Sequence, residues 1–178
     1  VSCATRVAGA AVDILVLAAD GAAVASQAAA VAGVGKVLVA DNSANVEPLA
    51  AVLAPQAAKL AAGYTHVFGP STTFGKDLMP RVAALLGVGQ VSDIMAVDGP
   101  HTFKRPIYAG NAVATVELPA DTVVVATVRV ASSTAPTDTT LAMQAGELKR
   151  LGEPSLPEAA TAMTPAARRR PKAAASAR

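Results

Sequence analysis

Short aliphatic runs recur along the first half of the chain. Residues 12–17 (VDILVL) and 36–40 (KVLVA) are nearly continuous apolar segments, and residues 64–69 and 90–97 repeat the pattern. Such runs are typical of parallel strands that helices cover on both faces. We therefore predict buried strands at these four positions.

Helix signals lie between the first three runs. Asp20 can accept hydrogen bonds from the free amides that begin a helix over about residues 21–31, and Gly33 can end that helix. A second helix is expected to run to about residue 62, capped by Asn42, Ser43 or Asn45. Pro55 lies inside it, so we predict a kink or a break there.

A third helix is predicted after residue 75. Its apolar residues recur at helical spacing, and Pro80 should kink it early or make it restart. The expected apolar stripe comprises Leu78, Val82, Leu85 and Leu86. Because strands and helices alternate, the chain is expected to fold as a doubly wound α/β domain with a mainly parallel sheet and right-handed crossovers.

The loop at residues 69–75 (GPSTTFG) follows the third predicted strand. Ligands of such folds usually bind at the carboxyl ends of strands. Small residues and hydroxyls at a helix amino terminus can also cradle a phosphate. However, the loop matches neither the Walker pattern nor the dinucleotide fingerprint. Helix capping by Ser71, Thr72 or Thr73 explains the same residues, so capping is the favoured interpretation.

Ser92 and Asp93 interrupt the fourth aliphatic run. A carboxylate at the centre of a covered strand is costly unless it is hydrogen-bonded or lies at the end of the strand. We therefore interpret Asp93 as a residue at the sheet margin, paired with local amides. A working acid or base is the alternative.

From Arg105 onward the apolar period changes to two. Residues 111–118 and 122–130 alternate, and Pro119 stands where a turn between them favours proline. A C-terminal antiparallel hairpin formed by these two segments is predicted. The polar residues Arg105, Tyr108 and Asn111 are candidates for contact with a partner chain. A hairpin with its bend at Gly110 is the simpler explanation of the same residues.

The pattern ends after residue 130. Residues 132–140 (SSTAPTDTT) have linker composition, and residues 141–151 are expected to form at most one short helix. Two regions follow: an α/β domain at residues 1–130 and a disordered tail rich in Ala, Pro and Arg at residues 131–178. The tail holds seven of the 15 basic and four of the 13 acidic side chains, so it accounts for the net charge of +2.

The basic run at residues 168–172 (RRRPK) suggests nucleic-acid binding by neutralisation of phosphates. A solvated tail is favoured because no aromatic residues interleave with the run. Nucleic-acid binding through the tail is therefore kept only as an alternative function.

The composition indicates one aliphatic core. Of the 178 residues, 52% are hydrophobic and only 3% aromatic, which suffices for a single domain. No apolar run reaches the roughly 20 residues needed to cross a bilayer, and we find no secretory signal. Cys3 is the only cysteine, which excludes an intramolecular disulfide and a cysteine-pair metal site. His66 and His101 have no recognised metal-ligand spacing, so no metal is expected.

Four motifs in order resemble the amino-terminal domain of the electron transfer flavoprotein alpha subunit. They are VAGVGKVLVAD, YTHVFGPSTTFGKDLMPRVAALL, QVSDIMAVD and TFKRPIYAGNAVATVE. The resemblance implies a nucleotide alpha-hydrolase-like α/β fold and a heterodimer with a beta subunit. It also implies FAD as the cofactor of the whole protein, which carries electrons from acyl-CoA and other dehydrogenases in fatty acid β-oxidation to a membrane quinone oxidoreductase. Such a carrier is not an enzyme; it would be cytoplasmic in bacteria and in the mitochondrial matrix of eukaryotes.

Two departures limit what the resemblance implies for this chain. Family members usually begin with one more strand and helix before the segment matching VDILVL, and they continue into a separate domain that makes most contacts to FAD. We therefore assign no catalytic, cofactor-binding or metal-binding residue. The chain is expected to act mainly as a partner-binding scaffold, with a stand-alone nucleotide-binding module that uses residues 69–75 as another alternative.

Overall fold

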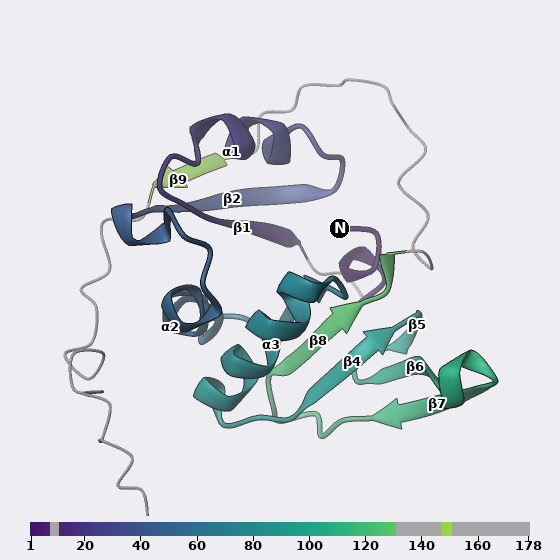
Figure 1. Ribbon diagram of the computed structural model, residues 1–178. Coiled ribbons are helices and arrows are strands. Elements are labelled where there is room, and N and C mark those ends of the chain that lie inside the picture. Colours follow the sequence, from purple (N-terminus) through teal and green to yellow (C-terminus); the bar gives the residue numbers. More distant parts are fainter. Residues whose placement is uncertain (8–10, 131–146, 151–178) are drawn as a thin grey trace, which may run out of the picture.

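The computed structural model describes residues 1–7, 11–130 and 147–150. These residues form three sheets of three strands each (Figure 1). The first sheet is parallel, in the order β1-β2-β9, and consists of Val12–Ala18, Val34–Asp41 and Glu147–Arg150. The second is also parallel, in the order β3-β8-β4, and consists of His66–Pro70, Val124–Val128 and Gln90–Ile94.

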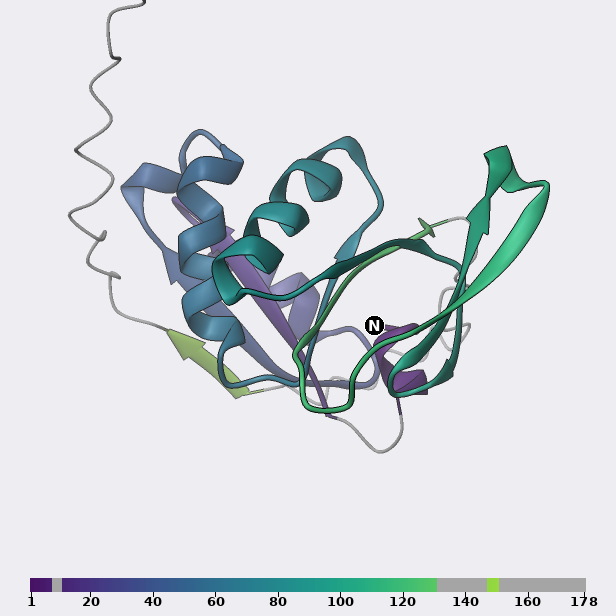
Figure 2. The ribbon, with the colours of Figure 1, turned by 90° about the horizontal axis from the view of Figure 1, so that it is seen from below.

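The third sheet is antiparallel. It contains β5 (Ala96–Gly99), β6 (Thr102–Ile107) and β7 (Ala112–Glu117), and β6 pairs with both neighbours. Figure 2 shows the β6–β7 hairpin extending away from the rest of the molecule. The expected fold class, an α/β fold with mainly parallel sheets and an antiparallel part, is therefore confirmed.

Three helices cover the parallel sheets. They are α1 (Ala22–Ala29), α2 (Ala50–Ala61) and α3 (Thr73–Leu86). Alternate residues of β1 point to opposite faces: Ile14 and Val16 belong to the cluster around Ala25 of α1. Leu15 and Leu17 instead belong to the cluster that α2 and α3 form. Helix α1 thus covers one face of the first sheet, and α2 and α3 lie on the other (Figure 1).

The first two helices begin differently from the prediction. The N-cap of α1 is Gly21, while the Asp20 carboxylate accepts the Ala22 amide at 3.4 Å. The N-cap of α2 is Leu49, because Asn42 caps a separate 3₁₀ turn, Ser43–Asn45, instead. Pro55 does not break α2, which continues through it. Proline removes one hydrogen bond from a helix interior, and the buried apolar face of α2 maintains the helix around it.

Helix α3 is continuous through Pro80, so the predicted restart is wrong. Gly87, in the left-handed region at φ 69°, ends it. Val82 is fully buried as predicted, whereas Leu85 is 57% exposed. Met79 and Ala83 are buried in its place, because the buried face is centred one position away from the predicted stripe.

The predicted pairing of residues 111–118 with 122–130 is wrong. β7 pairs with β6, and β8 lies in the second sheet between β3 and β4. The reason is burial: residues 124–127 are all 0% exposed, as in a strand covered on both faces, whereas β7 alternates between exposed and half-buried positions. The predicted strand over residues 90–97 is likewise two strands, because β4 ends at Ile94 and β5 begins at Ala96.

Part of the predicted tail lies within the described residues. Glu147–Arg150 form β9, parallel to β2, so the helix expected over residues 141–151 is wrong for these four positions. The rest of that segment, the basic run at residues 168–172 and the predicted disorder lie outside the described residues. The domain boundary at residue 130 stays a prediction. None of the described helices has the length and apolar character needed to span a membrane.

Candidate functional site

Hydrogen bonds within the protein satisfy backbone amides of the loop from β3 to α3. The Thr72 hydroxyl accepts the Gly75 amide at 3.2 Å, and the Ser71 amide donates to the Val128 carbonyl at 2.8 Å. The Gly75 backbone approaches so closely to Pro70 that a Cβ at Gly75 would overlap the Pro70 carbonyl oxygen. The helix amino terminus is therefore occupied by Thr72, and the capping interpretation of this loop is confirmed.

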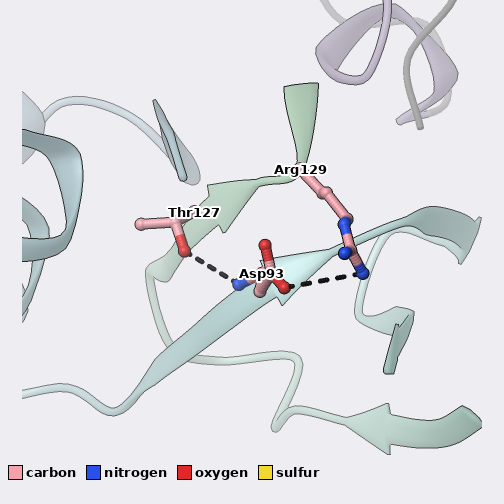
Figure 3. Close-up of polar contacts among 3 residues, drawn as sticks. All are labelled: Asp93, Thr127 and Arg129. Carbon is pink, nitrogen blue, oxygen red and sulfur yellow. Dashed lines mark hydrogen bonds and ion pairs between the residues drawn. The ribbon is translucent and has the colours of Figure 1, made fainter. Parts of the chain in front are cut away.

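Asp93 lies at a bulge near the carboxyl end of β4. The register of β4 against β8 shifts between Val91 and Ile94, and Asp93 has a left-handed backbone at φ 60°. Its amide donates to the buried hydroxyl of Thr127 at 2.8 Å, and its carboxylate lies 3.9 Å from Nη1 of Arg129 (Figure 3). Asp93 therefore lies at the sheet margin as predicted, but an arginine rather than local amides faces its carboxylate.

The contacts around Asp93 join two neighbouring strands. The side chains of Arg129 and Asp93 are 45% and 29% exposed, and an ion pair of that exposure contributes only about 0–1 kcal/mol. Arg129 also donates its backbone amide to the Ile94 carbonyl at 2.9 Å. The ion pair and both backbone contacts hold β4 against β8.

A second polar group at the carboxyl ends of β1 and β2 was not predicted. Asn45 and Gln56 are buried and exchange two side-chain hydrogen bonds of 3.2 and 2.6 Å. Asn45 also donates to the Ala40 carbonyl at 3.2 Å, and the Asp41 carboxylate accepts the Gly21 amide at 2.8 Å. The sequence signal was Gln56, a polar residue on the otherwise apolar face of α2.

The candidate partner residues lie on and near the tip of the β6–β7 hairpin. Tyr108 is 79% exposed, and both Tyr108 and Ala109 have left-handed backbones, at φ 50° and 55°. The Asn111 amide donates to the Tyr108 carbonyl at 3.1 Å. Arg105 lies instead within β6, opposite Ala114. The structure therefore brings Tyr108 and Asn111 together and leaves Arg105 apart from them.

The two histidines lie beside each other, and the cysteine is partly buried. His66 Nε2 donates to the Pro100 carbonyl at 2.6 Å, and its ring lies 5.6 Å from that of His101. Burial raises the pKa of the Cys3 thiol, although the amino terminus and Arg6 act in the opposite direction. Within the described ranges, no group of three or more His, Cys, Asp or Glu residues is placed to hold a metal ion.

A cavity of about 470 Å³ separates β1 from β3. β1 lines it with Asp13, Leu15 and Leu17, and β3 lines it with residues 66–70. Apolar residues of α2 and α3 cover it, among them Leu53 and Val82. Tyr64, just before β3, donates its hydroxyl to Asp13 Oδ2 at 2.6 Å at one end. The cavity is therefore a mainly aliphatic space with one carboxylate.

The parallel sheets, their covering helices and the four ordered motifs lead to one family. The profile of the electron transfer flavoprotein domain matches residues 1–156, and the chain belongs to this family. It is 52% identical over 114 residues to the electron transfer flavoprotein subunit alpha of Pseudomonas aeruginosa, covering 64% of this chain and 37% of that protein.

Two further relatives are also alpha subunits of electron transfer flavoproteins. The alpha subunit of Paracoccus denitrificans is 45% identical over 106 residues, covering 60% of this chain and 34% of that protein. The mitochondrial alpha subunit of Dictyostelium discoideum is 40% identical over 113 residues, covering 60% and 32%. The chain thus matches about a third of the length of these curated relatives.

The cavity does not fit the flavin cofactor that the family implies. The pyrophosphate of FAD is an anion, and proteins bind such groups with cations or free helix amino termini. Of the described side chains that line the cavity, that of Asp13 is a carboxylate, and none is Lys or Arg. At the first turns of α1 and α3, the carboxylate of Asp41 and the hydroxyl of Thr72 already accept backbone amides.

Proposed function

We propose that this chain serves as a partner-binding scaffold within an electron transfer flavoprotein alpha subunit. In this role it pairs with a beta subunit, and FAD is held by groups outside the described residues. The assembled protein carries electrons from acyl-CoA and other dehydrogenases. The family membership supports the electron-transfer role. The mainly aliphatic cavity with its single carboxylate supports the absence of a flavin site from this part of the protein.

The partner contact in this proposal includes the tip of the β6–β7 hairpin. Tyr108 offers an aromatic ring that is largely exposed, and tyrosine is enriched in protein interfaces because it combines apolar area with a polar end. A left-handed tyrosine backbone is uncommon and carries some strain. By relation to the bacterial and mitochondrial relatives, we place the protein in the bacterial cytoplasm, or in the matrix if its source is eukaryotic.

Co-expression of the full chain with an electron transfer flavoprotein beta subunit tests the proposal. A stable complex is expected on gel filtration, and the chain purified alone should show no visible flavin absorbance. Tyr108→Ala should weaken the complex without lowering the melting temperature of the chain. Leu85→Ala is a matched control because Leu85 is also an exposed apolar residue, on α3. Failure to co-purify contradicts the partner role, and one bound flavin per isolated chain contradicts the assignment of FAD to other residues.

A further inference from the structure

The Arg105 side chain lacks an acceptor among the residues that the structure describes. Arg105 lies in β6, opposite Ala114 of β7, and is half-buried. Its Nε atom is shielded from solvent and donates no hydrogen bond to a described group. Buried polar groups in proteins are almost always hydrogen-bonded, because an unsatisfied one lowers stability. The guanidinium of Arg105 therefore calls for an acceptor from elsewhere.

The face of the sheet that holds Arg105 is apolar. Side chains alternate between the two faces of a strand, so Arg105 shares its face with Phe103 and Ile107 of β6. Phe103 is fully buried in the core at the base of the hairpin. The β7 residues opposite these three are also apolar: Ala112, Ala114 and Val116. Within β5, β6 and β7, this face thus offers Arg105 no carboxylate.

Both acidic residues of β5–β7 lie on the other face. Asp98 of β5 forms an ion pair of 2.9 Å with Lys104, the residue next to Arg105. Glu117 of β7 lies opposite Thr102, on the same face as Lys104. The lysine of β6 therefore has its counter-charge inside the sheet, whereas the arginine has none there.

Arg105 continues the candidate contact surface at the tip of the hairpin. It comes three residues before Tyr108, whose side chain is exposed, on a hairpin that extends away from the rest of the molecule (Figure 2). Arginine and tyrosine are the residue types that dominate the binding energy of many protein interfaces. A partner that contacts the Tyr108 ring and covers the apolar face of the hairpin also encloses Arg105.

We propose that Arg105 binds an aspartate or glutamate side chain of the beta subunit on the face of the hairpin that it shares with Phe103. A guanidinium presents Nε–H and Nη–H donors side by side, and they match the two oxygens of a carboxylate. This bond satisfies Nε and neutralises the cation as the interface excludes water. The inference deepens the proposed function, because it rests on the pairing of this chain with a beta subunit.

Dissociation of the co-expressed complex on dilution tests the proposal, followed by the fluorescence anisotropy of a labelled beta subunit. Arg105→Gln removes the charge and leaves the partner's carboxylate unpaired. It should raise the dissociation constant by roughly tenfold to a hundredfold, the range of a hydrogen bond to a charged group. Arg105→Lys should lose less, because it keeps the charge without the fork of donors.

Lys104→Gln is the matched control for these variants. It removes the neighbouring positive charge, which already has Asp98 as its partner. The dissociation constant should change by less than about threefold, as for an exposed pair. Arg105→Gln should also leave the melting temperature of the chain alone undiminished, because its Nε bonds no described group. A lower melting temperature with an unchanged dissociation constant would instead assign Arg105 a role within the chain and overturn the proposal.

Carboxylate labelling identifies the acceptor. Carbodiimide coupling to glycine ethyl ester, read by mass spectrometry, modifies accessible aspartates and glutamates. One carboxylate of the beta subunit should be labelled at least about tenfold less in the complex with the natural chain than in the complex with Arg105→Gln, because an enclosed and bonded carboxylate reacts slowly. Equal labelling of every beta-subunit carboxylate in the two complexes contradicts the proposal.

The outcomes separate this inference from the proposed function. If the natural chain forms no complex, both fail. If Arg105→Gln binds the beta subunit as tightly as the natural chain does, this inference alone fails. Two other acceptors are also distinguishable. Protection of one of the chain's own carboxylates that requires Arg105 in the absence of the beta subunit identifies an internal acceptor. Heat of binding that requires Arg105 when inorganic phosphate is titrated into the chain identifies a free anion, and either result overturns the proposal.

Discussion

Tyr64 and Asp13 are 51 positions apart and share a hydrogen bond of 2.6 Å from the phenol Oη to the carboxylate Oδ2. The bond links the start of β1 to the residues that lead into β3. It raises the pKa of Tyr64 to about 12, with smaller contributions in the same direction from burial and from the charge of Asp13. The phenol must lose this bond when it ionises, which is why the neutral form is favoured.

The ionisation of Tyr64 should therefore occur near pH 12. The difference in absorbance at 295 nm between the natural chain and Tyr64→Phe isolates this residue from Tyr108. The pKa of Tyr64 in the folded chain lies above the usual tyrosine value of 10, so the stabilisation is complete below about pH 10 and is lost as the pH rises towards 12. In the Asp13→Asn variant the transition should shift to lower pH. An unchanged transition in that variant would disprove the role of the carboxylate.

Gly75→Ala should destabilise the chain. The new Cβ would overlap the Pro70 carbonyl oxygen, a backbone atom that cannot move without shifting the end of β3. Overpacking of this kind costs about 1–3 kcal/mol of unfolding free energy. The measurement is urea denaturation followed by circular dichroism. Gly89→Ala is the control, because a Cβ at Gly89 meets nothing within 4 Å; equal losses in both variants would contradict the close approach at Gly75.

Much of the fold follows from the aliphatic runs, since the first three predicted strands lie close to β1, β2 and β3. The place of β8 was predicted wrongly because the turn at Pro119 suggested a hairpin with the preceding strand. Yet residues 123–126 (VVVA) form a continuous apolar run rather than an alternation, which is the pattern of a strand covered on both faces. The turn residues around Pro119 favour a local hairpin, whereas the strands that pair with β8 are β3 and β4, which are more distant in sequence.

The candidate sites were only partly predictable. Thr72 has both the residue type and the position of a helix cap, so local sequence sufficed. The Asn45–Gln56 pair and the contact from Asp93 to Thr127 join residues 11 and 34 positions apart. Such contacts depend on how helices and strands pack together, and periodicity contains no information about them. The sequence marks Asp93 as unusual in a strand, but it does not identify Thr127 and Arg129 as its partners.

Thr127→Val should destabilise the junction of β4 and β8. The substitution keeps the size of a fully buried side chain and removes the hydroxyl that accepts the Asp93 amide. A buried donor left without a partner costs about 1–3 kcal/mol. Thr122→Val removes a hydroxyl that bonds the Pro119 carbonyl at an exposed site, so it should have a smaller effect. Denaturant midpoints compare the two, and a neutral Thr127→Val would contradict the importance of this bond.

The buried amide pair joins Asn45, in the turn after β2, to Gln56 on α2. Asn45→Ala and Gln56→Ala should each be destabilising, because each leaves buried polar groups of its partner unsatisfied. The double variant should lose less than the sum of the single losses, with a coupling energy of about 0.5–3 kcal/mol in a double-mutant cycle.

A second cycle with Ser26→Ala in place of Asn45→Ala provides the control. The Ser26 hydroxyl donates to the Ala22 carbonyl within its own helix and is exposed, so it should not couple to Gln56. Additive losses for Asn45 and Gln56 would show that the two amides act independently. In that case, packing around α2 rather than the reciprocal hydrogen bonds would hold the turn after β2 against the helix.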